Sequence, residues 1–213
     1  MPMTPGIRAA ADRFILDTAN VKHVATNLPP GGLEREVEGF GWTVRQLLAH
    51  LATNQERYAI RLAEVAAGQP TTGDRDRADR DRRNDQAARR ARRTPSREIV
   101  RQLDQALVRI VSALDALSPE AADGNLGDRP LVERVTAWSK HCAEHGIDLI
   151  DTLPELRFDP LVLNWLLYVD YTGDAAREAR QHQLLEDLRE HYDREDAVAA
   201  DNPAAGTGEN DDA

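Results

Sequence analysis

Trp138-Ser139-Lys140-His141-Cys142-Ala143-Glu144-His145 is the stretch on which the interpretation of this sequence depends. It lies in a segment, residues 130–153, whose apolar side chains recur at helical spacing. On a helix, His141 and His145 stand one turn apart on the same face. Two imidazoles held in this way can chelate one metal ion. The pair therefore predicts a metal site on an inner helix face, with a further ligand from elsewhere in the chain.

The best candidate for that further ligand is His50, in Gly41-Trp42-Thr43-Val44-Arg45-Gln46-Leu47-Leu48-Ala49-His50-Leu51. Thr43, followed three residues later by Gln46, has the pattern of a capping box and predicts the start of a helix. An apolar stripe follows, and His50 lies at its edge, from where the side chain can point inward. A histidine at such a position is also typical of a hydrogen-bonded core residue, and that interpretation stays open.

The remaining pattern is helical almost throughout. Apolar residues recur at helical spacing over residues 4–24, 43–67, 94–117 and 130–153. The segment 69–94 is too long for the usual link between adjacent antiparallel helices, which favours a crossover. We therefore predict an all-α protein. A four-helix bundle with a long crossover spans residues 1–153, a helical appendage spans 154–196, and a disordered acidic tail spans 197–213.

Composition and charge restrict the function classes. The chain has 213 residues, 30% of them charged and 5% aromatic, and its net charge is −10. That charge argues against nucleic acid as the main partner, because phosphate neutralisation dominates such binding. No apolar run approaches the roughly 20 residues that span a bilayer. With no signal segment and with Cys142 as the one cysteine, we expect a cytoplasmic protein without disulfides.

The charge is unevenly distributed along the chain. Residues 74–93 hold nine arginines and five aspartates, which makes this stretch the one plausible anion-binding segment. A solvated, charged crossover explains the same pattern, and both interpretations stay open. Arg45, Arg57 and Arg83 are candidates to hold carboxylates near the histidines.

The segment Leu161–Val169 is apolar around its whole circumference if it is helical, with Asn164 as its one polar residue. One packed face cannot bury all of these side chains. An exposed patch that contains Trp165 and Tyr168 is typical of a protein interface, and two-fold dimers are the commonest oligomers. We therefore expect a homodimer through this segment. The alternative is that the segment covers the open end of the bundle.

The chemistry of the histidines leaves several hypotheses. Neutral imidazole binds zinc and also suits nickel, copper and iron. Three histidines leave a coordination position open, as in catalytic rather than structural zinc sites. The stretch from His141 to His145 also fits H-x-x-E-H, the inverted zinc-protease motif, in which Glu144 would be the general base. Glu144 is the one weak candidate for acid–base chemistry, so a metal-dependent hydrolase is a further alternative.

The stretch Gly41–Leu51, together with His141-x-x-x-His145, resembles the DinB/YfiT-like superfamily, in particular the N-terminal domain of mycothiol-dependent maleylpyruvate isomerases. The resemblance covers residues 7–153. It implies a four-helix bundle with a divalent metal, zinc first, at His50, His141 and His145. It also implies mycothiol, bacillithiol or glutathione as a co-substrate.

Further consequences of the resemblance concern the crossover and the reaction. Asn84 matches an asparagine often found in the family's crossover, and Arg83 and Arg45 join it as candidate cofactor-binding residues. The sterol-carrier-like C-terminal domain of the isomerases has no counterpart here. Two function hypotheses result. The first is a metal- and thiol-dependent transferase or isomerase acting on a small electrophile, and the second is a non-catalytic, dimeric binding or stress-response protein.

Overall fold

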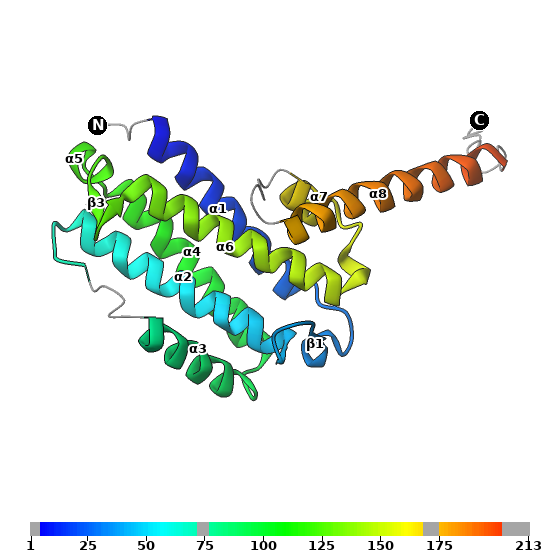
Figure 1. The fold of residues 1–213 in the computed structure, drawn as a ribbon, viewed down its shortest axis with the longest axis horizontal. Helices are drawn as coiled ribbons and strands as arrows, with labels where there is room; N and C mark the ends of the chain where they lie inside the picture. Colours follow the sequence, from blue (N-terminus) through cyan, green and yellow to red (C-terminus); the bar gives the residue numbers. More distant parts are fainter. Residues whose placement is uncertain (1–4, 72–76, 168–174, 202–213) are drawn as a thin grey trace, which may run out of the picture. The chain divides into compact units, whose positions relative to one another are not determined.

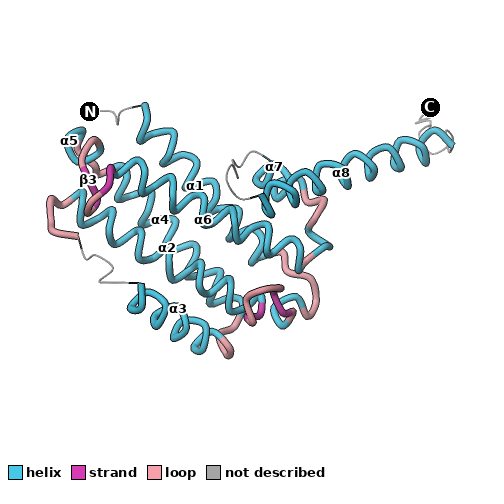
Figure 2. Tube along the Cα trace, viewed as in Figure 1, coloured by secondary structure: helices cyan, strands magenta, loops and turns pink. Residues whose placement is uncertain are grey.

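The protein is described by a computed structural model, which describes residues 5–71, 77–167 and 175–201. Helices dominate it, so the prediction of an all-α fold is confirmed (Figures 1 and 2). The α-helices are α1 (Pro5–Thr26), α2 (Val44–Ala66), α3 (Arg77–Ala91), α4 (Ser96–Asp115), α5 (Pro119–Ala122), α6 (Leu131–Thr152), α7 (Pro160–Leu167) and α8 (Ala175–Asp201). The 3-10 helices are η1 (Gly32–Glu34) and η2 (Pro154–Leu156), and the strands are β1 (Glu36–Val37), β2 (Trp42–Thr43), β3 (Asn125–Leu126) and β4 (Arg129–Pro130).

Four long helices, α1, α2, α4 and α6, run side by side and enclose the core (Figure 1). α1 packs against α4 and α6, and α2 packs against α4. Each helix contributes an apolar stripe at helical spacing, because only one face of it can turn inward. Among the most deeply buried side chains are Phe14, Leu47, Leu51, Leu103, Ile110, Val135 and Leu149.

The crossover between α2 and α4 is largely helical. α2 ends before Gly68, which adopts a left-handed conformation with φ 65°. α3 then packs along α2 and buries Ala88 and Ala91. The Gln46 side chain reaches across and donates a hydrogen bond to the carbonyl of Ala88, 3.1 Å away. The crossover is thus tied to the first turn of α2.

Two short antiparallel hairpins, β1–β2 and β3–β4, interrupt the helices, and no helical or strand period in the sequence predicted them (Figure 2). In the first, Glu36 pairs with Thr43 and Val37 with Trp42. Its turn contains Gly39 and Gly41 with φ of 81° and 63°, a region that glycine occupies without steric cost. This hairpin leads directly into α2.

The apolar segment after residue 160 forms the helix α7, which packs on its own chain. α7 packs against α1 and α6, and the exposed fraction of Trp165 is 0%. The expectation of an exposed Trp165 as the anchor of a subunit interface is therefore wrong, because its own chain encloses the ring. Leu161 is 56% exposed, and Tyr168 and Val169 lie outside the described residues. The oligomeric state stays a prediction, which light scattering can check.

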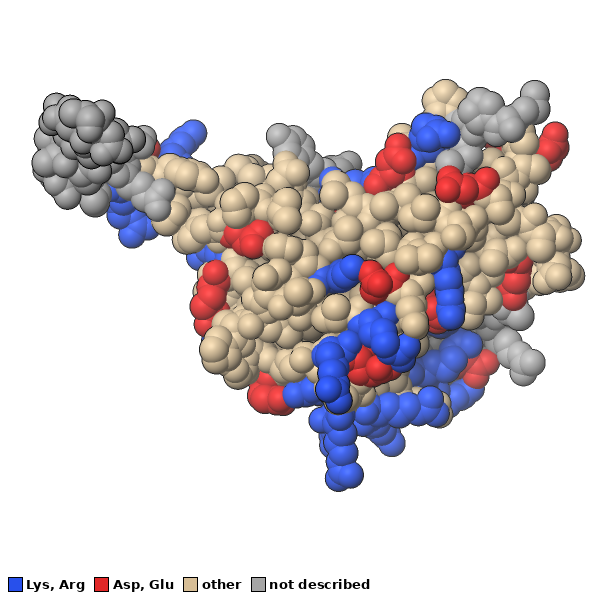
Figure 3. All heavy atoms as spheres, turned by 180° about the vertical axis from the view of Figure 1, so that it is seen from behind, with Lys and Arg blue, Asp and Glu red and all other residues tan. Residues whose placement is uncertain are grey.

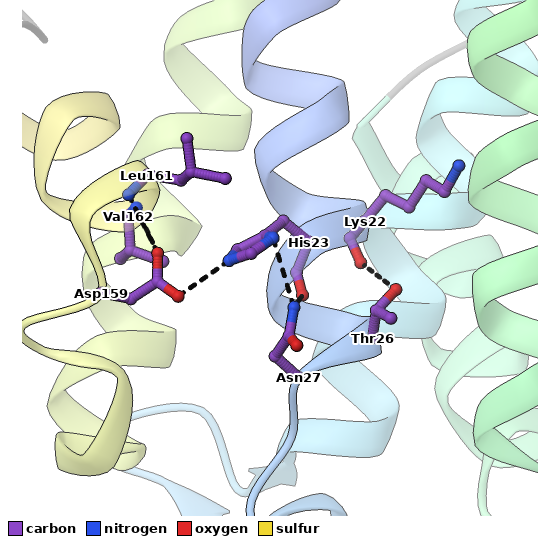
Figure 4. Close-up of polar contacts among 7 residues, drawn as sticks. All are labelled: Lys22, His23, Thr26, Asn27, Asp159, Leu161 and Val162. Carbon is purple, nitrogen blue, oxygen red and sulfur yellow. Dashed lines mark hydrogen bonds and ion pairs between the residues drawn. The ribbon is translucent and has the colours of Figure 1, made fainter. Parts of the chain in front are cut away.

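The start of α7 is fastened to the end of α1 (Figure 4). Asp159 Oδ1 accepts hydrogen bonds from the backbone N–H groups of Leu161 and Val162, at 2.9 and 3.2 Å, and so caps the helix. Its other oxygen lies 2.9 Å from Nε2 of His23, and the Asn27 amide donates to the His23 carbonyl. His23, in the last turn of α1, therefore joins α1 to α7.

The chain forms two compact units, Met1–Asp170 and Tyr171–Ala213. The second unit consists, in its described part, of α8, a charged helix that ends at Asp201. The predicted acidic tail begins at residue 197, so its first residues continue α8, and residues 202–213 lie outside the described residues. Among the helices that the structure describes, none is long and apolar enough to cross a membrane.

Candidate metal centre

The first turn of α2 places His50. Thr43 adopts an extended conformation, and its side-chain oxygen accepts from the backbone N–H of Gln46 at 3.4 Å. The Gln46 side chain accepts in return from the backbone N–H of Thr43 at 3.0 Å. This reciprocal pair confirms the predicted capping box and begins the helix at Val44. His50 then falls on the inner face, 4% exposed.

α6 supplies the two other histidines. Its apolar stripe buries Trp138, Cys142 and Leu149, which fixes which face of the helix turns inward. His145 lies within this buried face at 7% exposure, and His141 lies at its edge and is half-buried. The two rings are one helical turn apart, with centroids separated by 4.6 Å.

The structure brings all three predicted histidines together, and we call His50, His141 and His145 the histidine cluster. One potential ligand atom from each lies within 4.8 Å of those from the other two. Nε2 of His50 is 3.3 Å from Nε2 of His141. The His50 ring centroid is 5.4 Å from that of His141 and 5.5 Å from that of His145. Residues 91 positions apart in the chain thus share one point between α2 and α6.

Two buried side chains orient the cluster. Asp148 Oδ2 lies 3.0 Å from Nδ1 of His145 and can accept a hydrogen bond from an Nδ1–H group, the tautomer in which Nε2 carries the lone pair. The Asn54 amide nitrogen lies 2.9 Å from Nε2 of His50 and 3.2 Å from Nε2 of His141. An amide group with two N–H donors can satisfy both ring nitrogens at once.

The electrostatic environment keeps His50 neutral. Burial above all, together with the neighbouring His145 and the positive charge of Arg57, lowers the pKa of His50 to about 3. Neutral imidazole is the form that offers a lone pair to a metal. The ring is thus in its ligating form throughout the physiological range.

Aromatic side chains from the β1–β2 hairpin flank the cluster. The ring centroid of Trp42 is 5.2 Å from that of His50, and that of Phe40 is 5.4 Å from that of His145. Phe40 sits in the glycine-containing turn and is 37% exposed. The hairpin therefore places an apolar edge between the histidines and solvent.

The other candidate residues have different surroundings. Arg45 donates to the carbonyl of Thr94 and pairs with Glu34. Arg83 and Asn84 line a pocket between α2, α3 and α4 together with Arg57. Glu144 is half-buried on α6.

Cys142 is a core residue. Its side chain is buried, and burial raises the pKa of the thiol to about 12. The Gln55 amide donates to its sulfur at 3.5 Å. A thiol that is protonated at neutral pH is neither a ready nucleophile nor a ready metal ligand.

Sequence reasoning missed Asn54 and Asp148. A signal for both was available, because Asn54 follows His50 by four residues and Asp148 follows His145 by three. Side chains at these spacings are neighbours on a helix surface. Asp148 is thereby a natural partner for the second ring nitrogen of His145, and Asn54 can reach Nε2 of His50.

Comparisons with known proteins identify the family of this chain. No curated protein and no solved structure matches the chain. A family model, the mycothiol maleylpyruvate isomerase N-terminal domain, matches residues 17–150, which include the whole histidine cluster. That domain is DinB-like, and the match covers more than half of the chain. The chain therefore belongs to the mycothiol maleylpyruvate isomerase N-terminal domain family.

Proposed function

We propose that the histidine cluster holds a divalent metal ion, zinc before nickel or iron, and that the protein uses it to transfer or isomerise small molecules with a low-molecular-weight thiol. The observation that supports this most directly is the convergence of three histidines in a buried position. The family match to a mycothiol-related domain supports the thiol. The finer assignments, which include the thiol among mycothiol, bacillithiol and glutathione, are proposals.

The residues fit such an ion in spacing and in chemistry. Bonds of about 2.0–2.1 Å around a tetrahedral zinc ion place neighbouring ligand atoms about 3.3–3.4 Å apart. The two Nε2 atoms of His50 and His141 are 3.3 Å apart. Asp148 holds the third ring through its Nδ1, the arrangement that carboxylates adopt behind metal-bound histidines.

A bound divalent ion would supply Lewis acidity, which lowers the pKa of a coordinated thiol or water and makes thiolate or hydroxide available at neutral pH. The chain's own residues would do the rest. Asp148 holds the His145 ring through Nδ1, which reduces the rearrangement needed on binding, whereas the Asn54 amide, which lies against Nε2 of His50 and of His141, would have to move aside for the ion. Phe40 and Trp42 restrict the access of water and offer an apolar surface to an electrophile.

The proposal is tested by metal analysis followed by activity. Purified protein should contain close to one equivalent of a divalent metal, and His50→Ala, His141→Ala and His145→Ala should each lose it. His182→Ala is the matched control, because His182 is an exposed histidine on α8. The metal-loaded protein should conjugate at least one of the three thiols to members of a panel of small electrophiles.

The outcomes separate the two function hypotheses. A wild type that binds no divalent metal contradicts the proposed centre. Metal binding without any thiol-dependent turnover would leave the non-catalytic binding role as the better explanation. Hydrolysis of peptide or ester substrates without any thiol-dependent reaction would instead favour a metal-dependent hydrolase in which Glu144 is the general base.

A further inference from the structure

The histidine cluster is largely closed to solvent. The exposed fraction of His50 is 4% and that of His145 is 7%, while His141, at the edge, is half-buried. The Nε2 atoms of His50 and His141 face each other at 3.3 Å, and the Asn54 amide lies against both. A metal ion, and any small molecule that joins it, therefore needs a way in that one of the surrounding elements must open.

The helices around the cluster are firmly packed. α2, which carries His50, packs against α4, and α6, which carries the other two histidines, packs against α1. α3 lies on α2, and Lys and Arg side chains gather along the edge of the molecule where α3 lies (Figure 3). Its inner side is fixed, because Ala88 is buried and its carbonyl accepts a hydrogen bond from the Gln46 amide at 3.1 Å. The β1–β2 hairpin differs from these helices.

The β1–β2 hairpin is anchored at its base (Figure 2). Val37 in β1 is 1% exposed, and β1 packs against α6. The backbone N–H of Val44, where α2 begins, donates to the carbonyl of Arg35 at 2.9 Å. Each strand is two residues long, so the ladder of hydrogen bonds ends close to this base.

The hairpin tip, residues 38–41, extends from this base, and all four of its residues are exposed. Gly39 and Gly41 have φ of 81° and 63°, and a Cβ atom at either would meet no atom within 4 Å. The backbone on both sides of Phe40 thus combines the conformational freedom of glycine with open space around it. A segment with so few contacts opens at a small cost in free energy.

Phe40 joins the hairpin tip to the cluster. Its ring centroid is 5.4 Å from that of His145, at an interplanar angle of 63°, and 6.1 Å from that of Trp42. The rings of His50 and His141 also contact His145, but both are held on long helices. Phe40 stands on a turn and is 37% exposed. Its ring is therefore the part of the cover over His145 that can move with least disturbance to the core.

We propose that Phe40 is the gate of the histidine cluster: its ring closes over His145, and the hairpin tip moves outward to admit a metal ion or a small-molecule ligand. Rotation at the two glycines displaces the ring and leaves the anchored base in place. Closure then returns an aromatic surface and keeps water from the site, as lid loops do. What passes the gate rests on the proposed function, whereas the gate itself can be tested in the metal-free protein.

Carbethoxylation by diethyl pyrocarbonate, mapped for each histidine by peptide mass spectrometry, tests the gate in the EDTA-treated full chain. The reagent modifies accessible imidazole nitrogens, and the exposed His182 gives a reference rate within the same chain. We expect His145 to react more slowly than His182 in the wild type. Phe40→Ala should accelerate the reaction of His145 about three- to ten-fold, the factor that corresponds to the loss of an ordinary aromatic contact.

Two variants control for effects unrelated to the ring. Phe40→Tyr keeps an aromatic ring at the hairpin tip and should retain the wild-type rate at His145. Leu16→Ala removes an apolar side chain of α1 whose exposed fraction, 40%, is close to that of Phe40. It should leave the rate at His145 unchanged. Circular dichroism of each variant verifies that the fold is retained.

Hydrogen exchange of the wild type gives a second test, which needs no variant. The backbone N–H of Phe40 donates to the Val37 carbonyl at 3.3 Å, whereas the N–H of Val44 belongs to the anchored base. Opening of the tip alone should let the Phe40 N–H exchange at least about ten-fold faster than that of Val44. Equally slow exchange at both positions would show that the tip does not open, and would overturn the proposal.

In the metal-loaded protein the gate should control rates rather than affinity. A chromophoric chelator should remove zinc faster from Phe40→Ala than from the wild type, while the zinc Kd stays within about two-fold, because Phe40 offers no ligand atom. A weaker Kd with an unchanged rate of release would show a structural role alone and would count against the gate. A wild type that binds no zinc would contradict the proposed function, and the diethyl pyrocarbonate rates would still decide the gate.

Three results of the carbethoxylation would overturn the proposal. One is a wild-type His145 that reacts as fast as His182. Another is an equal rate at His145 in the wild type and in Phe40→Ala. The third is an equal acceleration in Leu16→Ala, which would show that any loss of apolar surface loosens the cluster.

Discussion

The indole ring of Trp165 lies directly on Gly146, and a Cβ atom at that glycine would be 2.5 Å from Cη2 of the indole. Gly146 sits in the middle of α6, where glycine is otherwise an unfavourable helix residue. The missing side chain is what allows α7 to bury a tryptophan against α6. This contact joins the last helix of the first unit to the helix that carries two of the cluster's histidines.

Gly146→Ala should therefore destabilise the protein, although alanine favours a helix. We expect a loss of about 1–3 kcal/mol in the free energy of unfolding, because the extra methyl forces the indole or α6 to move. Urea denaturation followed by tryptophan fluorescence measures it. Gly6→Ala in α1 is the control, since a Cβ there meets no atom within 4 Å. Equal stability of both variants would show that Trp165 can move away without cost.

The free energy of unfolding should depend on pH through Asp17. Its carboxylate accepts hydrogen bonds from Ser139 and, at 2.7 Å, from the indole N–H of Trp165, and it pairs with Arg13 at 3.0 Å. Burial nevertheless raises the pKa of Asp17 to about 6. The folded protein thus holds a proton at this site at pH values where the unfolded chain has lost it.

The sign follows from that difference. The stabilisation from the protonated carboxyl is complete below about pH 4 and is lost as the pH rises through about 6. Relative to Asp17→Asn, which does not titrate, the wild type should lose about 2–2.5 kcal/mol between pH 4 and pH 7. Urea unfolding of both proteins across this range measures the difference in the free energy of unfolding. The contributions of other titrating groups largely cancel in this difference, because both proteins contain them. Parallel curves would contradict the shifted pKa.

Metal affinity should depend on Asp148. Asp148→Asn removes the anionic acceptor behind His145 and should weaken zinc binding about 10- to 100-fold, while the fold is retained. A competition titration with a chromophoric chelator measures the affinity. Asp151→Asn, an exposed residue on the same helix, should bind zinc as the wild type does. An unchanged zinc affinity of the Asp148→Asn variant would mean that the carboxylate does not influence metal binding through His145.

The capping box should contribute to stability through both of its members. Thr43→Ala should lower the free energy of unfolding by about 1 kcal/mol, because it leaves the Gln46 backbone N–H without its acceptor. Thr136→Ala, an exposed threonine within α6, is the control. A double-mutant cycle with Gln46→Ala should show coupling between the two side chains. Additive effects would indicate that the two hydrogen bonds form independently.

Much of the fold was predictable because its signals are local. The capping box at Thr43 and the apolar spacing that follows it define α2 within its own sequence, and α2 runs from Val44 to Ala66 as that pattern indicates. The stacking of His141 above His145 needs only the pitch of a helix. The β1–β2 hairpin lacked such a signal, since strands of two residues are too short to show a period.

Only part of the histidine cluster could be predicted from helical spacing. Its α6 pair could be placed from spacing, whereas the approach of His50 depends on how α2 meets α6. The family resemblance anticipated that approach, and the geometry of the cluster agrees with it. The roles of Asn54 and Asp148 became visible only when the orientation of each ring was known.

The sequence by itself determined where the helices lie and which of their faces are apolar, because helical spacing and capping are properties of neighbouring residues. Only the tertiary structure decided what each apolar face meets. The segment that contains Trp165 has the same composition whether it covers its own chain or a partner, and Gly146, 19 positions earlier, decides the outcome by leaving room for the ring. The choice between those contacts depends on the free energy of burying complementary surfaces that are distant in the chain, which no local pattern encodes.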